Sequence, residues 1–297
     1  MRGLFGKCML DLGGTDVPAA LMEDTETCLR ESERLMNRWH MSAGGRLRYA
    51  FAPRFVPSCT ETLLTRTRDM ARANGVRLHT HLCETKDEER WTLETHGVRP
   101  LEYMARLGWT GSDVWYAHGI HFNDEELREL ARTGTGVAHC PISNMKLSSG
   151  VARVPEMLAL GVPVGLAVDG SASNDGSSLM EELRVCYLLH RLTSSDKAPS
   201  GYQVLKLATR GSAALLGRED IGQLAAGKRA DLFLVDARRL ELAGAEYSPA
   251  DVLATVGLRG PVDYTVVEGR IVVKEGLLAG VDEAAVAERA RAVCKAY

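Results

Sequence analysis

Three histidines and an aspartate recur along the middle of the chain, each separated from the next by roughly one strand–helix unit. They are His81, His118, His139 and Asp169, and each stands at or near the end of an apolar run. Imidazole nitrogen and carboxylate oxygen are donors that Zn²⁺ accepts, so these four residues could form one metal site. Glu84 follows His81 by three residues, where a carboxylate could transfer protons beside a metal-bound water.

Each of these residues also has a simpler interpretation when it is taken alone. A single histidine at a strand end is more often a core or surface residue than a ligand. The pair Asp169-Gly170 is typical of a turn, and the charged run 86–90 is typical of a solvated helix start. The conjunction favours a site, because independent accidents would not place such residues at the ends of successive strands.

The elements that must position these residues alternate along the first two thirds of the chain. Asn123 and Gly134 are typical of a helix N-cap and C-cap. The apolar runs are continuous, which indicates a parallel sheet covered by helices, either doubly wound or a (β/α)8 barrel. In a barrel the carboxyl ends of the strands meet at one mouth, which would bring the histidines and Asp169 together. The predicted strands are 2–10, 47–55, 76–82, 114–122, 135–141 and 163–170, and the predicted helices are 20–40, 60–75, 124–134 and 177–192.

The last third has a different pattern. Residues 227–237 and 262–278 predict antiparallel strands, with a hairpin turn at Glu268-Gly269. A further helix is expected from about Asp282. The predicted domains are a partial barrel with the metal site at 1–222, a β-rich domain at 223–281 and a C-terminal helix at 282–297.

Composition narrows the class of protein. The chain of 297 residues is 45% hydrophobic, enough for one large or two smaller α/β domains. Its net charge of −3 is spread along the sequence, which gives no electrostatic case for nucleic acid or a membrane as partner. No apolar run approaches the roughly 18 residues of a membrane span, and no signal peptide is seen. The seven cysteines are scattered without a CxxC pair. We therefore expect a soluble, reduced, cytoplasmic protein.

Longer motifs resemble those of a known family. HTHLCET, AHGIHFNDEEL, AHCPISNMKLSSG, GLAVDGSASND and ADLFLVD occur in this order and resemble the amidohydrolase superfamily, in its purine- and triazine-deaminase branch. Within the branch, GWTGSDVWYAHGIH and VDGSASNDGSSLMEELR are most similar to the 8-oxoguanine deaminases. The resemblance implies a TIM-type barrel and the hydrolytic deamination of a planar heteroaromatic amine. It also implies one divalent metal ion as cofactor, zinc in preference to iron.

The resemblance implies a role for each candidate residue of the reaction. His81 and Asp169 would bind the metal. Glu84 would shuttle protons, and His118 would orient the attacking water. Asp169 would also accept a proton from that water. No lysine lies in 47–55, where relatives with two metals place a bridging lysine, and this favours a single ion.

The resemblance also implies substrate contacts. His139 and Asn144 would line the substrate side of the site. Arg54 resembles the arginine by which guanine deaminases hold a purine carbonyl. Its segment departs from the 8-oxoguanine deaminase pattern. Conversion of 8-oxoguanine to urate and ammonia is therefore the first expectation, while triazines, guanine and 5′-deoxyadenosine or S-adenosylhomocysteine stay open.

A second departure concerns the first barrel strand of the family, which carries His-x-His. This chain has that motif only at His79 and His81, and His81 with Glu84 fits the fifth strand instead. We therefore expect barrel strands three to eight, in a chain that lacks the N-terminal part, with His79 as a packing residue. Open sheet edges would favour a homodimer. A catalytically inactive scaffold is the alternative from another class, because two protein ligands hold zinc weakly.

Overall fold

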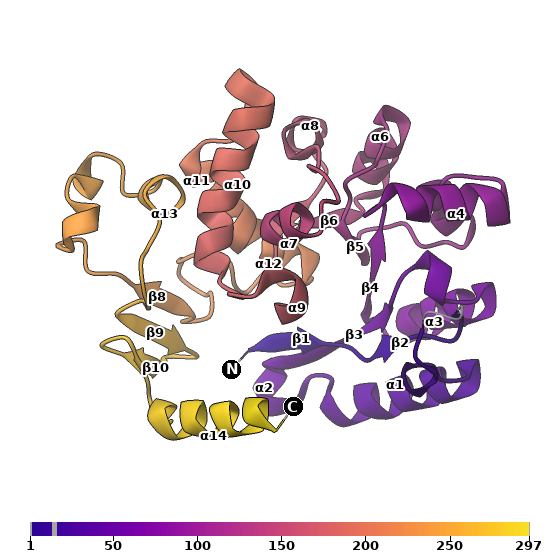
Figure 1. The fold of residues 1–297 in the computed structure, drawn as a ribbon, viewed down its shortest axis with the longest axis horizontal. Helices are drawn as coiled ribbons and strands as arrows, with labels where there is room; N and C mark the ends of the chain where they lie inside the picture. Colours follow the sequence, from indigo (N-terminus) through magenta and orange to yellow (C-terminus); the bar gives the residue numbers. More distant parts are fainter. Residues whose placement is uncertain (1, 14–16, 297) are drawn as a thin grey trace.

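The computed structural model describes residues 2–13 and 17–296. A curved parallel sheet has helices packed on its outer face, and a smaller antiparallel sheet lies to one side of it (Figure 1). The strands are β1 Gly3–Phe5, β2 Cys8–Met9, β3 Leu47–Pro53, β4 Arg77–Leu82, β5 Val114–His118, β6 Gly136–His139, β7 Val164–Leu166, β8 Leu232–Leu234, β9 Tyr264–Val267, β10 Arg270–Lys274 and β11 Leu277–Leu278.

The parallel sheet has the order β1-β3-β4-β5-β6-β7, and β2 also pairs with β3. β1 and β2 pair with successive parts of β3. The run predicted as one strand at 2–10 therefore occupies one place in the sheet, but Gly6 and Lys7 divide it into two short strands. Among the described residues, the outer edges of β1 and β7 pair with no further strand. The sheet is thus a half-barrel, and the expected incomplete TIM-type fold with a small C-terminal sheet is confirmed.

Helices follow most strands and cover the convex face of the sheet (Figure 1). The predicted caps of α6 are present: Asn123 and Glu126 form a capping box, and Gly134 has φ 71°. The helices are α1 Thr25–Trp39, α2 Ser42–Gly45, α3 Glu61–Ala73, α4 Lys86–His96, α5 Pro100–Arg106, α6 Asp124–Thr133, α7 Pro141–Lys146, α8 Val154–Leu160, α9 Ser171–Asn174, α10 Leu179–Ser194, α11 Gly201–Lys206, α12 Ser212–Leu215, α13 Val252–Thr255 and α14 Glu283–Lys295.

The two faces of the strands bury different clusters. Residues that point outward, such as Leu78, Tyr116 and Val137, join the large core between sheet and helices. Residues that point inward, such as Trp115 and Ala138, form a small cluster inside the half-barrel. This alternation decides which side chains at the strand ends can reach a common cavity.

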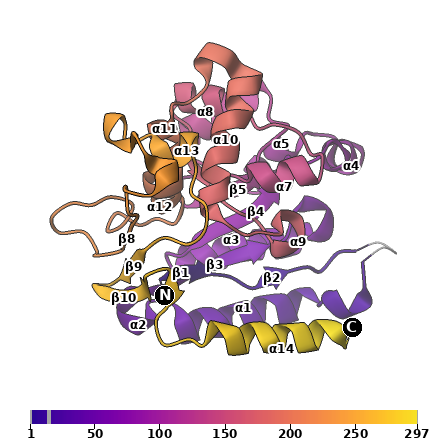
Figure 2. The same ribbon diagram turned by 60° about the vertical axis from the view of Figure 1, so that its left-hand side comes forward.

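The antiparallel sheet has the order β11-β10-β9-β8. Glu268 and Gly269 have φ of 52° and 75°, and two successive positive values are typical of a tight hairpin, as predicted for this turn. Arg2 forms ion pairs with Asp231 and Glu268, which tie the start of the parallel sheet to the small sheet. β1 lies close to β9 and β10 in both ribbon views (Figure 2). No helix among the described residues combines the length and apolarity of a membrane span. The domain boundaries and the homodimer stay predictions.

Candidate metal and active site

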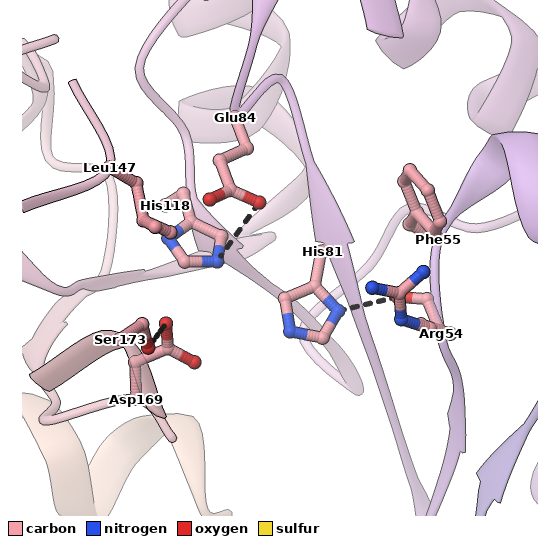
Figure 3. Close-up of a pocket in the computed structure, with 8 residues that line it drawn as sticks. All are labelled: Arg54, Phe55, His81, Glu84, His118, Leu147, Asp169 and Ser173. Carbon is pink, nitrogen blue, oxygen red and sulfur yellow. Dashed lines mark hydrogen bonds and ion pairs between the residues drawn. The ribbon is translucent and has the colours of Figure 1, made fainter. Parts of the chain in front are cut away.

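A cavity of about 240 Å³ opens at the carboxyl ends of β3, β4, β5 and β7. The four residues whose convergence the sequence predicted most directly, His81, Glu84, His118 and Asp169, all line it (Figure 3). They come from three strand ends that lie far apart in the sequence. The remaining lining residues are Arg54, Phe55, Leu147 and Ser173.

Backbone strain places two of these side chains. Because Trp115 points inward, strand alternation alone would direct His118 outward to the helices. His118 instead has φ 70°, and Asp169, three residues beyond β7, has φ 62°. Positive φ is rare for residues other than glycine and is concentrated at functional sites. Here it accompanies two side chains that line the cavity.

The donor atoms of His81, His118 and Asp169 lie within 4.8 Å of one another. The rings of His81 and His118 are stacked, with centroids 5.3 Å apart. Nδ1 of His81 contacts the carbonyl oxygen of Arg54. Because a carbonyl oxygen can only accept, the proton of a neutral His81 is on Nδ1 and the lone pair is on Nε2. Such a backbone contact is typical of histidines that bind a metal.

Asp169 is oriented by two serine hydroxyls that sequence reasoning did not single out. Ser143 Oγ and Ser173 Oγ both donate to its Oδ2, at 2.6 and 2.7 Å. Burial by itself raises the pKa of Asp169, but these two hydrogen bonds hold that pKa below its usual value. The side chain is therefore a carboxylate at neutral pH. Both serines lie inside quoted motifs, but nothing in their residue type distinguishes them from the other serines there.

Glu84 stands on a turn that a second glutamate holds in place. Its Oε2 lies 3.5 Å from His118 Nε2, and burial raises the pKa of Glu84, which favours the acid form. The carboxylate of Glu88 accepts the backbone N–H groups of Cys83 and Glu84 at 3.1 and 2.9 Å. The run 86–90 does begin a helix, as predicted, but Glu88 is buried and not solvated.

The structure does not bring His139 to the cavity. It follows the inward-pointing Ala138, so alternation turns it outward to α10. There its Nε2 lies 3.3 Å from His190 Nε2, and Cys186 completes a fully buried group. Burial lowers the pKa of His190 to about 4 and raises that of Cys186 to about 12. The group is thus a neutral contact between β6 and α10, and the position of His139 gives no support to a substrate contact.

The other two residues expected to touch the substrate are placed differently from each other. Arg54 lines the cavity, with its guanidinium carbon 4.7 Å from the centre of the Phe55 ring (Figure 3). Asn144 is buried on α7 behind His118, and its Nδ2 lies 2.9 Å from His118 Nδ1. Its position supports a role through His118 in place of a direct substrate contact.

Comparison with known proteins agrees with this geometry. The sequence profile of the amidohydrolase family matches residues 1–272. The chain belongs to the amidohydrolase family. It is 42% identical to 8-oxoguanine deaminase of Pseudomonas aeruginosa over 100% of this chain and 66% of that protein. It is also 42% identical to hydroxydechloroatrazine ethylaminohydrolase of a Pseudomonas species, over 94% of this chain and 59% of that protein.

The fold of this amidohydrolase also matches solved structures. Atrazine chlorohydrolase TrzN from Arthrobacter aurescens TC1, crystallised with zinc, superposes with a TM-score of 0.93 at 29% sequence identity. The alignment covers 98% of this chain and 66% of that one. The chain thus spans about two thirds or less of the length of these three relatives.

The donor set of this amidohydrolase fits a divalent metal. His81 offers an imidazole lone pair on Nε2, and Asp169 is an ionised carboxylate whose Oδ1 accepts no hydrogen bond from the described residues. Nitrogen and oxygen donors of this kind suit zinc and iron. His118 is close enough to be a third ligand, so its protonation decides how many ligands the cavity offers.

Proposed function

We propose that this chain acts as a metal-dependent aminohydrolase on a purine base, with 8-oxoguanine as the first candidate substrate. The observation that carries the proposal is the convergence on one cavity of the His81 imidazole, the ionised Asp169 carboxylate and a partly buried Glu84 whose pKa burial raises. The identity of 42% to an 8-oxoguanine deaminase supports the choice of substrate. The cavity of about 240 Å³ is small, which suits a base of one or two rings.

His81 and Asp169 would hold the metal in this site. When bound, the ion would lower the pKa of a water molecule to about 7 and so supply a nucleophile at neutral pH. The Arg54 guanidinium would donate to a carbonyl oxygen of the base and orient it in the cavity.

The protons would move through the carboxylates. Glu84 as the acid would protonate a ring nitrogen, which makes the amine-bearing carbon electrophilic. Glu84 would regain a proton from the attacking water, and Asp169 would accept the second proton of that water as the carbonyl forms and pass it to the amine, which leaves as ammonia. General acid–base catalysis of this kind contributes about 10²–10⁴-fold.

A triazine substrate is the second candidate, because two of the compared relatives are named for triazine chemistry. Ammonia release from 8-oxoguanine, guanine, 5′-deoxyadenosine, S-adenosylhomocysteine and hydroxyatrazine, with zinc or iron(II) supplied, separates these candidates. We expect release from 8-oxoguanine, with formation of urate, and none from the His81→Ala variant. Reaction of hydroxyatrazine alone would reject the purine assignment.

The inactive scaffold stays the alternative from another class. Its supporting observation is the short donor set of this cavity: among the described residues, His81, His118 and Asp169 are the group that could hold a metal there. Metal analysis of the purified chain discriminates: stoichiometric zinc together with ammonia release excludes the scaffold. No bound metal and no release from any of the five compounds would establish it.

A further inference from the structure

The carboxylate of Asp169 is held by residues of two short helices. Ser173, on α9, belongs to the segment that directly follows Asp169, whereas Ser143 lies on α7, 26 residues earlier in the chain. Both hydroxyls donate to Oδ2, and the other carboxylate oxygen is directed toward His81 (Figure 3). Both serines can reach one oxygen only while α7 and α9 keep their spacing. The orientation of Asp169 therefore depends on the contacts that hold these two helices together.

A single buried carboxylate from a third helix contacts both of them. Glu182, on α10, is fully buried, and its Oε2 accepts the backbone N–H of Ile142 at 3.2 Å. Its Oε1 accepts a hydrogen bond from Asn174 Nδ2. Ile142 directly precedes Ser143 in the sequence. Asn174 directly follows Ser173. Each oxygen of Glu182 thus holds the chain neighbour of one serine.

The direction of both hydrogen bonds is set by backbone groups. A backbone N–H can only donate, so Ile142 requires an acceptor on Glu182. Asn174 Oδ1 accepts the N–H of Ser177 at 2.7 Å, which leaves the Nδ2 donor for Glu182. Both partners are therefore donors, as a carboxylate requires. At pH 8 most of Glu182 is in that form, because burial raises its pKa to about 7.

A second link between α7 and α9 lies at the surface. Lys146 Nζ donates to the Ala172 carbonyl oxygen at 3.0 Å and to the Asp175 carboxylate at 2.7 Å. These residues are exposed, and exposed ion pairs contribute little because water and salt screen them. Hydrogen bonds to a buried carboxylate are stronger, and a buried donor left without an acceptor is costly. We therefore expect the buried link to determine the spacing of the two helices.

We propose that Glu182 is a positioning residue: it holds α7 against α9 so that the two serines orient the Asp169 carboxylate toward the cavity. Glu88 has a similar arrangement in the same chain, since its two oxygens hold the backbone N–H groups of the turn that carries Glu84. Glu182 is not among the residues that line the cavity, so it acts only through its contacts. Its effect on turnover rests on the proposed function, whereas its effect on Asp169 does not.

Glu182→Gln tests the proposal with almost no change in size. An amide at this position offers one oxygen to two donors, so one of the two contacts must bring donor against donor. In crystal structures of the zinc-free chain at pH 8, we expect Ser143 Oγ to withdraw from Asp169 in E182Q, while Ser173 keeps its contact within its own segment. Retention of both serine contacts in E182Q would overturn the proposal.

A second substitution should restore the arrangement. In E182Q/N174D the donor and the acceptor of the pair are exchanged: the glutamine NH₂ donates to the new carboxylate, and the glutamine oxygen accepts from Ile142. The new carboxylate still accepts the N–H of Ser177. We expect this double variant to regain the Ser143 contact. If E182Q alone does not fold, the double variant still decides, because the proposal requires it to fold with Ser143 on Asp169. A double variant that behaves like E182Q would overturn the proposal.

The affinity for zinc gives a readout that a loss of stability alone would not move. Residues that orient metal ligands change affinity about 10–100-fold when replaced, and Glu182 acts one contact further away, so we expect Kd to rise about tenfold in E182Q at pH 8. It should return to the wild-type value in E182Q/N174D. Glu181→Gln, at the exposed neighbouring position, and Lys146→Met, which removes the exposed link, are the matched controls and should leave Kd unchanged. An equal rise in K146M would assign the spacing to the surface pair and overturn the proposal.

Failure of this proposal can be told apart from failure of the proposed function. If the wild-type chain releases no ammonia or binds no zinc, the proposed function fails, and the distance between Ser143 and Asp169 in E182Q still decides the role of Glu182. If the wild-type chain is active and E182Q matches it in zinc affinity and in kcat, only the role of Glu182 fails.

Discussion

His79 and His81 are two residues apart on β4, yet their surroundings have little in common. His79 stacks on Trp115 inside the half-barrel with ring centroids 4.8 Å apart, and burial lowers its pKa to about 3. His81 lies at the rim, where Nδ1 meets a carbonyl and Nε2 faces the cavity. His79 thus packs, as expected from the sequence. The surroundings of each histidine depend on a residue from a neighbouring part of the sheet: Trp115 of β5 for His79, and Arg54, just after β3, for His81.

The role proposed for Glu84 predicts the effect of removing its acidic proton. Glu84→Gln keeps the size of the side chain but cannot shuttle a proton, so we expect kcat for ammonia release to fall about 10²–10⁴-fold. Zinc content should be unchanged, because Glu84 is not one of the proposed ligands. Glu94→Gln is the control, because Glu94 is exposed on α4, the helix that follows Glu84 in the sequence. Full activity in E84Q would remove Glu84 from the mechanism.

At the scale of elements, strand ends and helices divide the candidate residues between two places. β4, β5 and the segment after β7 deliver His81, His118 and Asp169 to the cavity. β6 delivers His139 to α10, where it meets His190. In the sequence, the four strands share one pattern, an apolar run with a histidine or an aspartate at or near its end. The difference arises because His139 keeps the regular alternation of its strand, whereas His118 and Asp169 have left-handed backbone conformations.

The buried contact between β6 and α10 predicts that the folded protein loses stability in acid. An unfolded histidine binds a proton with a pKa near 6.5, whereas burial among His139 and Cys186, partly opposed by the charge of Glu156, holds the pKa of His190 at about 4. The unfolded state therefore binds more protons between these values, and stability falls as the pH is lowered from 6.5 to 4. The loss attributable to His190 is about 3 kcal/mol by pH 4.

Urea unfolding at several pH values checks this expectation. His190→Gln removes the titrating ring, so the free energy of unfolding should depend less steeply on pH between 6.5 and 4. His96→Gln, at the partly exposed end of α4, should keep most of the wild-type slope. An unchanged slope in H190Q would show that other groups govern the acid sensitivity.

At the scale of the whole molecule, the half-barrel leaves the sheet edges at β1 and β7 without strand partners among the described residues. The cavity lies at the carboxyl ends of its strands, as in other barrels of this type. With His81 and Asp169 as the proposed ligands, the described residues offer zinc two protein ligands, where structural and catalytic zinc sites use three or four. We therefore expect measurable but weak zinc binding.

Thermal unfolding with and without zinc measures that binding. A ligand that binds only the native state stabilises it by about 2.7 kcal/mol at one hundred times its Kd, so Tm should rise with zinc and return after chelation. His81→Ala should abolish the rise, and His96→Ala should not. An equal rise in H81A would place the zinc elsewhere in the molecule.

The amino-acid sequence by itself determined the order of strands and helices, the small C-terminal sheet and the strand ends that carry His81, Glu84, His118 and Asp169. Apolar periodicity and caps are local properties, and they can be recognised without knowing what packs where. The long motifs further indicated the family, which the comparison confirmed.

Only the tertiary structure decided which of these residues meet and in what state. It turned His139 away from the cavity, placed Ser143 and Ser173 on Asp169, and put Asn144 behind His118. These contacts join segments separated along the chain, and they depend on backbone angles and burial that residue type does not specify. The protonation of each group follows from such contacts, because burial and hydrogen-bond partners shift a pKa and select a tautomer.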